Sequence, residues 1–206
     1  MELSFWLSLF SICLLGAMSP GPSLTVVMRS TLHGGHRAGY ASAVAHGFAV
    51  ALYGLITVAG LAMILTRTPV IFLGLQFLGA LYLLYLGIKS LRRSSGAALT
   101  GNEDAAGHSP IVSGFLVAFL NPKLAIFMLA LFSQFLRPES GWEEKWIMVA
   151  TVGITDMCWY AVVTLLISRK SFLTRLRNRA AIIDRVFGVI LILLASTVMW
   201  HVVTGH

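Results

Sequence analysis

The sequence is poor in charged residues. Of its 206 residues, 11% are Asp, Glu, Lys or Arg and 57% are hydrophobic, whereas a soluble globular domain carries about 25% charged residues. A chain of this composition lacks the polar side chains needed to cover a water-facing surface. Its hydrophobic residues form long continuous runs, unlike the short alternating segments of a β-barrel. The composition therefore indicates a helical protein solvated by lipid.

The sequence also lacks the motifs of several function classes. It contains no Walker-type phosphate loop, and no GxSxG or HExxH sequence of a hydrolase. It has two cysteines, Cys13 and Cys158, and both fall inside hydrophobic runs. A small packing residue is a better interpretation of each than a disulfide or a metal ligand. We therefore expect no cofactor and no metal.

Six hydrophobic runs are long enough to cross a bilayer, which takes roughly 20 apolar residues in a helix. The first run is preceded by Glu2 and by no Lys or Arg, so it does not fit a signal peptide. Little of the chain lies outside the runs. The sequence predicts an all-α integral membrane protein with six transmembrane helices. The runs cover residues 5–27, 40–65, 69–88, 111–136, 146–168 and 186–203.

Positive charge is concentrated in alternate connections. Most Lys and Arg residues lie between the first and second, third and fourth, and fifth and sixth runs. The positive-inside rule places these connections in the cytoplasm and both termini in the periplasm, for a protein of the inner membrane. The net charge of +7 is then explained by topology and anionic lipid, and we expect no nucleic-acid partner. Residues 171–185 show helical spacing of apolar residues among arginines, which predicts an amphipathic helix at the cytoplasmic interface.

A polar segment divides the chain into two halves. Residues 92–110 are small, polar and of mixed charge, and they predict a cytoplasmic linker between residues 1–91 and 111–206. Each half has three hydrophobic runs, so the halves have opposite orientations in the membrane. When Ser19-Pro20 is aligned with Asn121-Pro122, both halves begin with an apolar helix broken at the same place. This pattern predicts two inverted three-helix repeats.

Prolines interrupt the first and fourth runs, at Ser19-Pro20-Gly21-Pro22 and at Asn121-Pro122-Lys123. Proline inside a helix costs about 3 kcal/mol, and in lipid the freed backbone groups must be satisfied inside the protein. Paired breaks of this kind indicate the binding site of a transporter, because helix N-termini attract anions and C-termini attract cations. The residues assigned to substrate binding are Ser19, Pro20, Gly21, Pro22, Asn121, Pro122 and Lys123.

Three ionisable residues lie well inside the runs, where charge is costly and commonly functional. Asp156 is the only acid expected at depth, and it predicts a proton carrier or a partner for a substrate amino group. Lys123 is a candidate partner for a substrate carboxylate, or it caps the broken helix or pairs with Asp156. His46 is a candidate proton relay, or a hydrogen-bonded packing residue. Further candidates for neutral hydrogen bonds are Ser23, Thr25, Thr155 and Gln134.

Small residues recur along the second run. Gly39, Ala43, Gly47 and Ala51 have four-residue spacing and predict a face that another helix approaches closely. That helix belongs either to the same chain or to a second copy in a homodimer. Gly34-Gly35 predicts a tight turn between the first two runs.

The motifs together resemble the LysE/RhtB-type amino-acid exporters. The matching segments are Ser19-Pro20-Gly21-Pro22, GALYLLYLGIKSLR in the third run, GFLVAFLNPKLAIFMLALFSQF in the fourth, and Ile183-Asp184-Arg185 before the sixth. The resemblance implies a six-span inner-membrane exporter of an amino acid or close derivative, driven by the proton gradient. Many members carry an acidic residue in the second span, where this chain has AVAHGFAVALYG with His46.

Two other function classes stay open from the sequence. One is an intramembrane enzyme using His46, Asp156 and Ser19, but the paired proline breaks have no role in it. The other is a structural subunit of a membrane complex, which has no need for buried charge. We therefore favour a secondary exporter by proton antiport, and not an enzyme.

Overall fold

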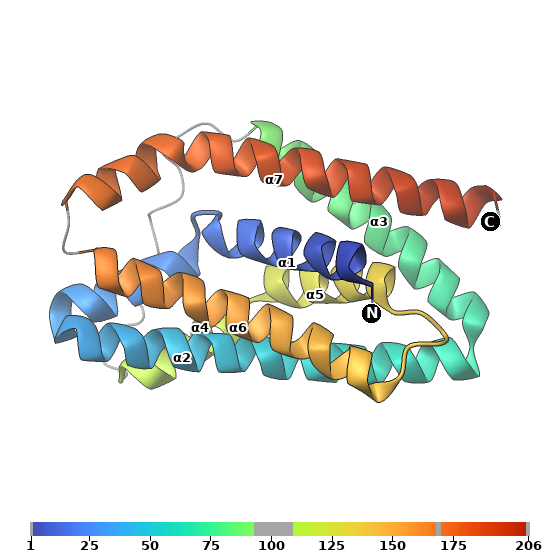
Figure 1. Cartoon of the computed structure of the whole chain (residues 1–206), viewed down its shortest axis with the longest axis horizontal. Helices are drawn as coiled ribbons and strands as arrows, with labels where there is room; N and C mark the ends of the chain where they lie inside the picture. The colour runs from blue at the N-terminus through green and yellow to red at the C-terminus, as the bar shows by residue number, and fades with distance from the viewer. Residues whose placement is uncertain (1, 93–108, 168–169, 205–206) are drawn as a thin grey trace.

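The computed structural model describes residues 2–92, 109–167 and 170–204, and every element in these ranges is an α-helix (Figure 1). In Figure 1, α3 and α7 form an upper layer and α2 and α6 a lower one, with α1 and α5 between them. The prediction of an all-α fold is confirmed. The helices are α1 (Leu3–Met18), α2 (Pro22–Arg67), α3 (Pro69–Arg92), α4 (Pro110–Phe119), α5 (Pro122–Phe135), α6 (Trp142–Leu166) and α7 (Lys170–Thr204).

Four of the described helices are long and apolar enough to cross a membrane: α2, α3, α6 and α7. Helices α4 and α5 give a fifth candidate when they are taken as one span, bent by 56° at a short break. Helix α1 has 16 residues, or about 24 Å at 1.5 Å per residue, which is shorter than a hydrocarbon core of about 30 Å. Large apolar side chains such as Val70 and Leu193 are exposed, as expected where lipid replaces water. The chain is a multi-pass membrane protein.

Helix α2 contains the turn predicted between the first two runs. It continues from Pro22 to Arg67, but Gly35 interrupts it with φ 72° and ψ −177°, a conformation that glycine adopts at low cost. The predicted turn at Gly34-Gly35 is therefore confirmed. The first hydrophobic run is divided between α1 and the arm of α2 before this turn.

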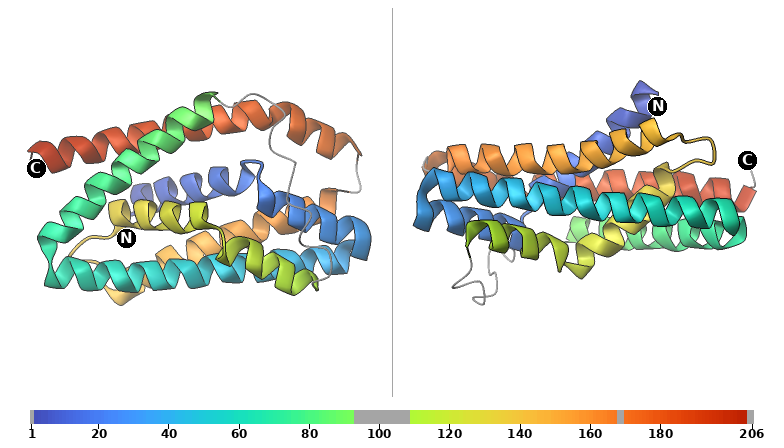
Figure 2. Two further views of the ribbon diagram at one scale, coloured as in Figure 1. Left: turned by 180° about the vertical axis from the view of Figure 1, so that it is seen from behind. Right: turned by 90° about the horizontal axis from the view of Figure 1, so that it is seen from below.

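Three helix pairs pack most extensively, α2 with α6, α2 with α4 and α3 with α7, and the pairs α2–α6 and α3–α7 form the frame of long helices (Figure 2). Glycines allow the backbones to touch at both crossings. A Cβ atom on Gly47 would lie 2.8 Å from the carbonyl oxygen of Gly153, and one on Gly188 would lie 2.7 Å from that of Gly87. The small-residue face of the second run therefore packs against α6 of the same chain. A homodimer stays a prediction.

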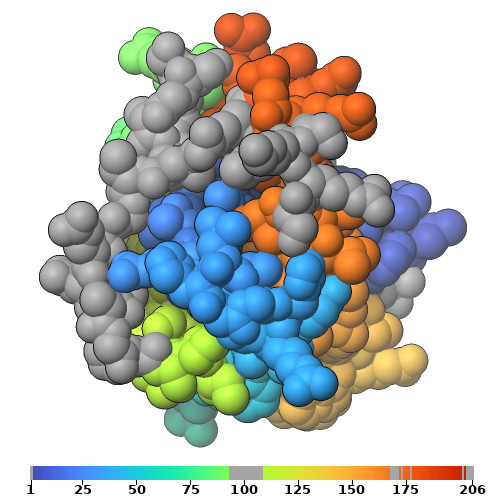
Figure 3. Space-filling view, turned by 90° about the vertical axis from the view of Figure 1, so that its left-hand side faces the viewer, coloured from blue at the N-terminus to red at the C-terminus, as the bar shows by residue number. Residues whose placement is uncertain are grey.

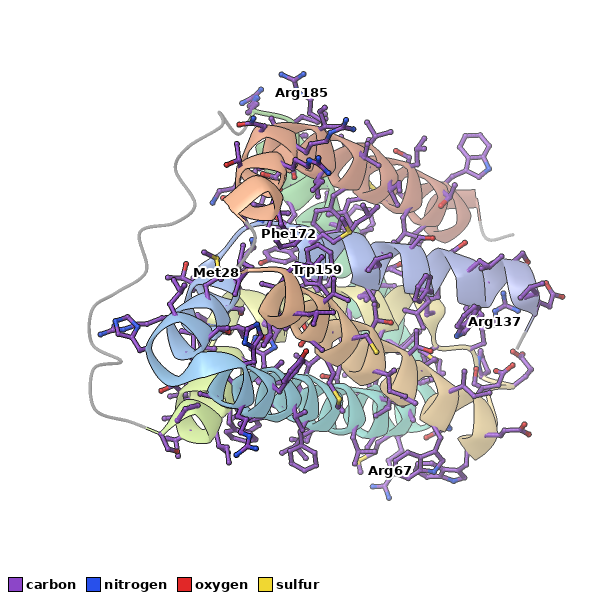
Figure 4. The ribbon with its side chains drawn as sticks, turned by 60° about the vertical axis from the view of Figure 1, so that its left-hand side comes forward. Met28, Arg67, Arg137, Trp159, Phe172 and Arg185 are labelled. Carbon is purple, nitrogen blue, oxygen red and sulfur yellow. The ribbon has the colours of Figure 1, made fainter. Side chains whose placement is uncertain are left out.

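The region predicted as a separate amphipathic helix is instead the first part of α7, which continues unbroken into the last apolar run. At this end of the molecule a small apolar cluster joins α2, α6 and α7, and it includes Met28, Trp159 and Phe172 (Figure 4). Figure 3 looks onto the same end, where the turn of α2, α4 and the start of α7 lie at the surface. Most of the predicted linker, residues 93–108, lies outside the described residues.

Candidate functional site

A cavity of about 580 Å³ lies among the helices and includes residues of both proline breaks. The cavity also receives side chains from α1, α2, α3, α5, α6 and α7, so all the layers of the fold meet there. Of the predicted site residues, only Pro122 does not line it, and Pro122 is exposed. The residues that line it are Ser19, Pro20, Gly21, Pro22, His46, Asn121, Lys123 and Asp156.

The cavity has apolar walls and a basic rim. Asp156 is the one acid among its described lining residues, whereas the bases Lys89, Arg92 and Lys123 are all exposed. The walls favour an apolar group on the ligand, and the rim favours entry of an anionic group. The apolar wall residues include Val50, Leu86, Leu124, Phe127, Met128, Val152 and Phe187.

Asp156 on α6 pairs with His46 on α2 in the cavity wall. The His46 Nδ1 to Asp156 Oδ2 distance is 2.6 Å, and both residues are buried. When Asp156 is ionised its carboxylate can only accept hydrogen bonds, so Nδ1 of His46 is then the donor and Nε2 carries the lone pair. Nε2 is buried and has no hydrogen-bond partner among the described residues. The ring of Tyr160, one turn beyond Asp156, lies edge-on to the His46 ring at 4.8 Å.

The alternative pairing of Lys123 with Asp156 is wrong, because Asp156 pairs with His46. Lys123 lies in the first turn of α5 and is exposed at the cavity rim. Sequence position alone had placed Lys123 inside the span, but the break exposes it.

The first break is connected to a distant helix. Helix α1 ends at Met18, and the Ser19 hydroxyl donates a 2.7 Å hydrogen bond to Oδ1 of Asp184 on α7. Helix α2 then begins at Pro22, and its N-cap residue Gly21 provides no capping side chain. The first amides of a helix have no partners within the helix. The start of α2 is therefore an uncapped helix N-terminus beside the cavity.

The second break caps itself. Oδ1 of Asn121 accepts hydrogen bonds from the amides of Lys123 and Leu124, at 3.0 and 3.3 Å. This is the usual N-cap arrangement of asparagine. The first amides of α5 are therefore already occupied by a side chain.

Asp184 is the residue that the sequence analysis missed. It is 4% exposed, so Asp156, the one acid expected at depth in the hydrophobic runs, is not the only acid that is buried among the described residues. A sequence signal exists, because Asp184 precedes the buried residues Phe187 and Leu191 by three and seven positions and so shares their helix face. The arginines on either side of Asp184 obscured that signal.

Of the neutral candidates, Ser23 lines the cavity but the other three do not. The Thr25 hydroxyl donates to the carbonyl of Gly21 at 3.3 Å. Gln134 donates to the carbonyl of Gln76 at 3.0 Å, and so connects α5 to α3. Thr155 is buried away from the cavity. Thr25, Gln134 and Thr155 therefore contribute to the packing of the helices and not to the lining of the cavity.

A multi-pass helical protein with a cavity between two broken helices has the construction of a membrane transporter. Comparison with known sequences supports this class. The family model for the LysE type translocator matches residues 14–201. The chain belongs to the LysE type translocator family.

Several relatives are similar over much of the chain. An uncharacterized membrane protein of Pseudomonas aeruginosa is 31% identical over 65% of this chain and 64% of its own length, so the chain spans just under two thirds of that relative. The leucine efflux protein of Salmonella typhimurium is 29% identical over 79% of this chain and 78% of its own. A membrane protein of Bacillus subtilis is 23% identical over 84% of this chain and 88% of its own. No solved structure matches the chain.

Proposed function

We propose that this protein is a secondary exporter that moves an amino acid or close derivative out of the cell in exchange for protons. The observation that carries the proposal is the His46–Asp156 pair, which lies in the wall of a cavity lined by both proline breaks. Relatives named leucine efflux protein support an amino-acid substrate. We propose leucine, or another neutral amino acid with an apolar side chain, as the substrate.

The chemistry of the cavity matches the two ends of such a substrate. Asp156 is the acid in the wall and suits the ammonium group. The uncapped start of α2, at Gly21 to Ser23, suits the carboxylate, because helix N-termini favour anions. The start of α5 suits it less, since Asn121 occupies those amides. The apolar wall residues would contact the substrate side chain.

The His46–Asp156 pair gives a simple means of proton coupling. When the pair takes up one additional proton, either His46 becomes an imidazolium or Asp156 becomes a neutral acid, and in both cases the pair holds an ammonium group less well. Release of that additional proton leaves a neutral His46 beside an ionised Asp156, whose carboxylate charge is again available to the substrate. Competition between a proton and an ammonium for one carboxylate is sufficient for exchange in opposite directions.

We further propose six membrane spans arranged as two inverted repeats. In this arrangement the first span combines α1 with the first arm of α2, and the fourth combines α4 with α5. The two glycine crossings support the repeat, because Gly47 meets Gly153 and Gly87 meets Gly188. The partners in each pair are separated by roughly half of the 206-residue chain, as expected when equivalent residues of two halves meet.

The proposed orientation has the cytoplasm at the end where α2 turns and α7 begins, with Arg67, the last residue of α2, at the opposite end (Figure 1). The start of α1 and the end of α7 both lie toward that opposite end (Figure 1), which suits two periplasmic termini of an inner-membrane protein. The cavity reaches Lys89 and Arg92 in the last turns of α3, so it would face the cytoplasm. Contacts at the other end fit a closed periplasmic side: Trp6 donates to Thr151 at 2.9 Å, and Arg137 lies 4.3 Å from the Phe5 ring centroid.

The enzyme alternative is weaker. A hydrolytic set needs a serine hydroxyl on the open nitrogen of His46, but the Ser19 hydroxyl donates to Asp184. The structural-subunit alternative does not explain the buried His46–Asp156 pair. A buried pair of this kind is a poor source of stability, so a purely structural role gives no reason for it.

The test is leucine efflux from proteoliposomes containing the purified chain, measured with and without an imposed proton gradient and with a protonophore. We expect the gradient to accelerate efflux by the wild type. Asp156→Asn should keep folding and insertion but lose the acceleration, because an amide carries no titrating proton. Glu139→Gln is the matched control, since Glu139 is exposed outside the helices.

Two results would contradict the proposal. Gradient-driven efflux by Asp156→Asn equal to that of the wild type would remove Asp156 from proton coupling. Wild-type vesicles that release no leucine or other neutral amino acid under any gradient would refute the substrate assignment.

A further inference from the structure

We propose that Asp184 is a positioning residue of the transport site, which sets the geometry of the first break by holding the Ser19 hydroxyl. The proposal rests on the proposed function, because it gives Asp184 a role in shaping the cavity in which we place the substrate. Asp184 itself does not line that cavity, but Ser19 and Ser90, its two hydroxyl partners, both do. It therefore acts on the substrate through another residue.

Asp184 connects three helices at one point. Its carboxylate Oδ1 accepts from the Ser19 hydroxyl at the end of α1, at 2.7 Å. Its main-chain oxygen accepts from the Ser90 hydroxyl near the end of α3, at 2.6 Å. Asp184 and Ser90 are both buried. The bond between Ser19 and Asp184 is partly buried. A hydrogen bond to a carboxylate is stronger than one between neutral groups, and it holds its donor in a narrow range of positions.

The first break depends on this connection. Ser19 has an extended conformation, with φ −63° and ψ 121°, and the next residue, Pro20, has no amide hydrogen to donate. Gly21 has no side chain with which to cap α2. The Ser19–Asp184 bond therefore fixes the position of the end of α1. It thereby also sets the path that the chain takes through Gly21 and Pro22 into α2. Asn121 needs no such partner at the second break.

The same stretch of α7 also reaches the cavity directly. Phe187, one turn beyond Asp184, lines the cavity and packs against Phe127 of α5, with ring centroids 6.2 Å apart. Its ring would lie 3.6 Å from a Cβ on Gly16 of α1. A shift of α7 would therefore move the first break and one cavity wall together.

The test compares three substitutions in leucine-loaded proteoliposomes. Asp184→Ala removes the acceptor, Ser19→Ala removes the donor, and Asp184→Asn removes the charge while keeping an oxygen that accepts. We expect the first two to raise the KM for leucine about tenfold, or about 1.4 kcal/mol, and Asp184→Asn to raise it less, because its neutral oxygen still accepts the Ser19 hydrogen bond but more weakly. The double variant should be no worse than Asp184→Ala alone, because the Ser19–Asp184 bond that Ser19→Ala removes is already absent from Asp184→Ala.

A structural measurement makes the test independent of substrate. Hydrogen exchange should accelerate at the amides of Ser19 and Thr25, which bond to Leu15 and Gly21, in Asp184→Ala and Ser19→Ala. The amides after Asn121 should not change and serve as the internal reference. Ser8→Ala is the matched control, because the Ser8 hydroxyl bonds only within α1, to the carbonyl of Ser4.

The outcomes separate this proposal from the proposed function. If the wild type releases no leucine, the proposed function fails and exchange at the first break still decides the role of Asp184. Unchanged KM and unchanged exchange in Ser19→Ala and Asp184→Ala would overturn the positioning role while leaving the exporter intact. Asp184→Asn as defective as Asp184→Ala would also overturn it, since charge and not an acceptor would then be required. If Asp184→Ala does not fold, Ser19→Ala and Asp184→Asn carry the test.

Discussion

At the first proline break, Ser19 at the end of α1 is held by a carboxylate on α7, 165 residues away along the chain. At the second, Asn121 caps α5 with its own side chain, two and three residues away. The first break leaves the start of α2 uncapped, whereas the second has already used its first amides. Two similar proline motifs are therefore stabilised in different ways.

The difference indicates that the two breaks have different roles in the site. A local cap fixes the second break whatever the rest of the protein does, so it suits a constant wall. A long-range bond makes the position of the first break depend on the position of α7. The uncapped amides also make the first break the better candidate for binding a carboxylate.

The largest expected effect comes from disrupting the glycine crossing between α3 and α7, which belongs to the frame that supports both breaks. Gly188→Val would place a Cβ 2.7 Å from the backbone oxygen of Gly87. Backbone cannot yield as a side chain does, and we expect a loss of at least about 1–3 kcal/mol of stability and little folded protein in detergent. The measurement is thermal unfolding together with size-exclusion chromatography.

The control for this substitution is Gly60→Val, because a Cβ on Gly60 meets nothing within 4 Å. Gly60→Val should fold as the wild type does. A normally folded Gly188→Val would show that the α3–α7 crossing is looser than its geometry indicates, and the two breaks would then not share a rigid frame.

An intermediate effect is expected when the first break is obstructed. Gly21 has φ −161° and ψ −172°, extended backbone that any residue adopts, and a Cβ there would lie 3.9 Å from the nearest atom. Gly21→Val should therefore fold normally while crowding the proposed carboxylate position, with a rise in leucine KM of about tenfold or more. Gly141→Val is the matched control, because Gly141 is likewise an uncapped helix N-cap with open space around it. An unchanged KM in Gly21→Val would place the carboxylate elsewhere.

The smallest effect is expected at the second break. Asn121→Ala removes the cap of α5 and should lower stability by about 1 kcal/mol, measured as a fall of about 2–4 °C in Tm. Leucine KM should change little, because the cap does not contact the proposed ligand. Asn121→Ser keeps a capping oxygen and should restore the Tm. If Asn121→Ala raised the KM for leucine as much as Gly21→Val, both breaks would contribute equally to binding. That result would contradict the assignment of the carboxylate to the first break.

Much of the site could be predicted from sequence. The positions of both breaks followed from proline in apolar runs, and burial of His46 and Asp156 followed from their depth in those runs. The partners could not be predicted, because spacing along a helix does not determine which residue of another helix faces it. Lys123 was therefore wrongly offered as a partner of Asp156, and the bond between Ser19 and Asp184 was missed.

The sequence by itself determined that this chain is helical, membrane-spanning and broken at two prolines, because composition, run length and proline chemistry act locally. Only the tertiary structure decided which side chains meet: His46 with Asp156, Ser19 with Asp184, and the glycines at the two crossings. These contacts join residues on different helices, and they depend on the rotation and crossing of whole helices, which no local pattern determines.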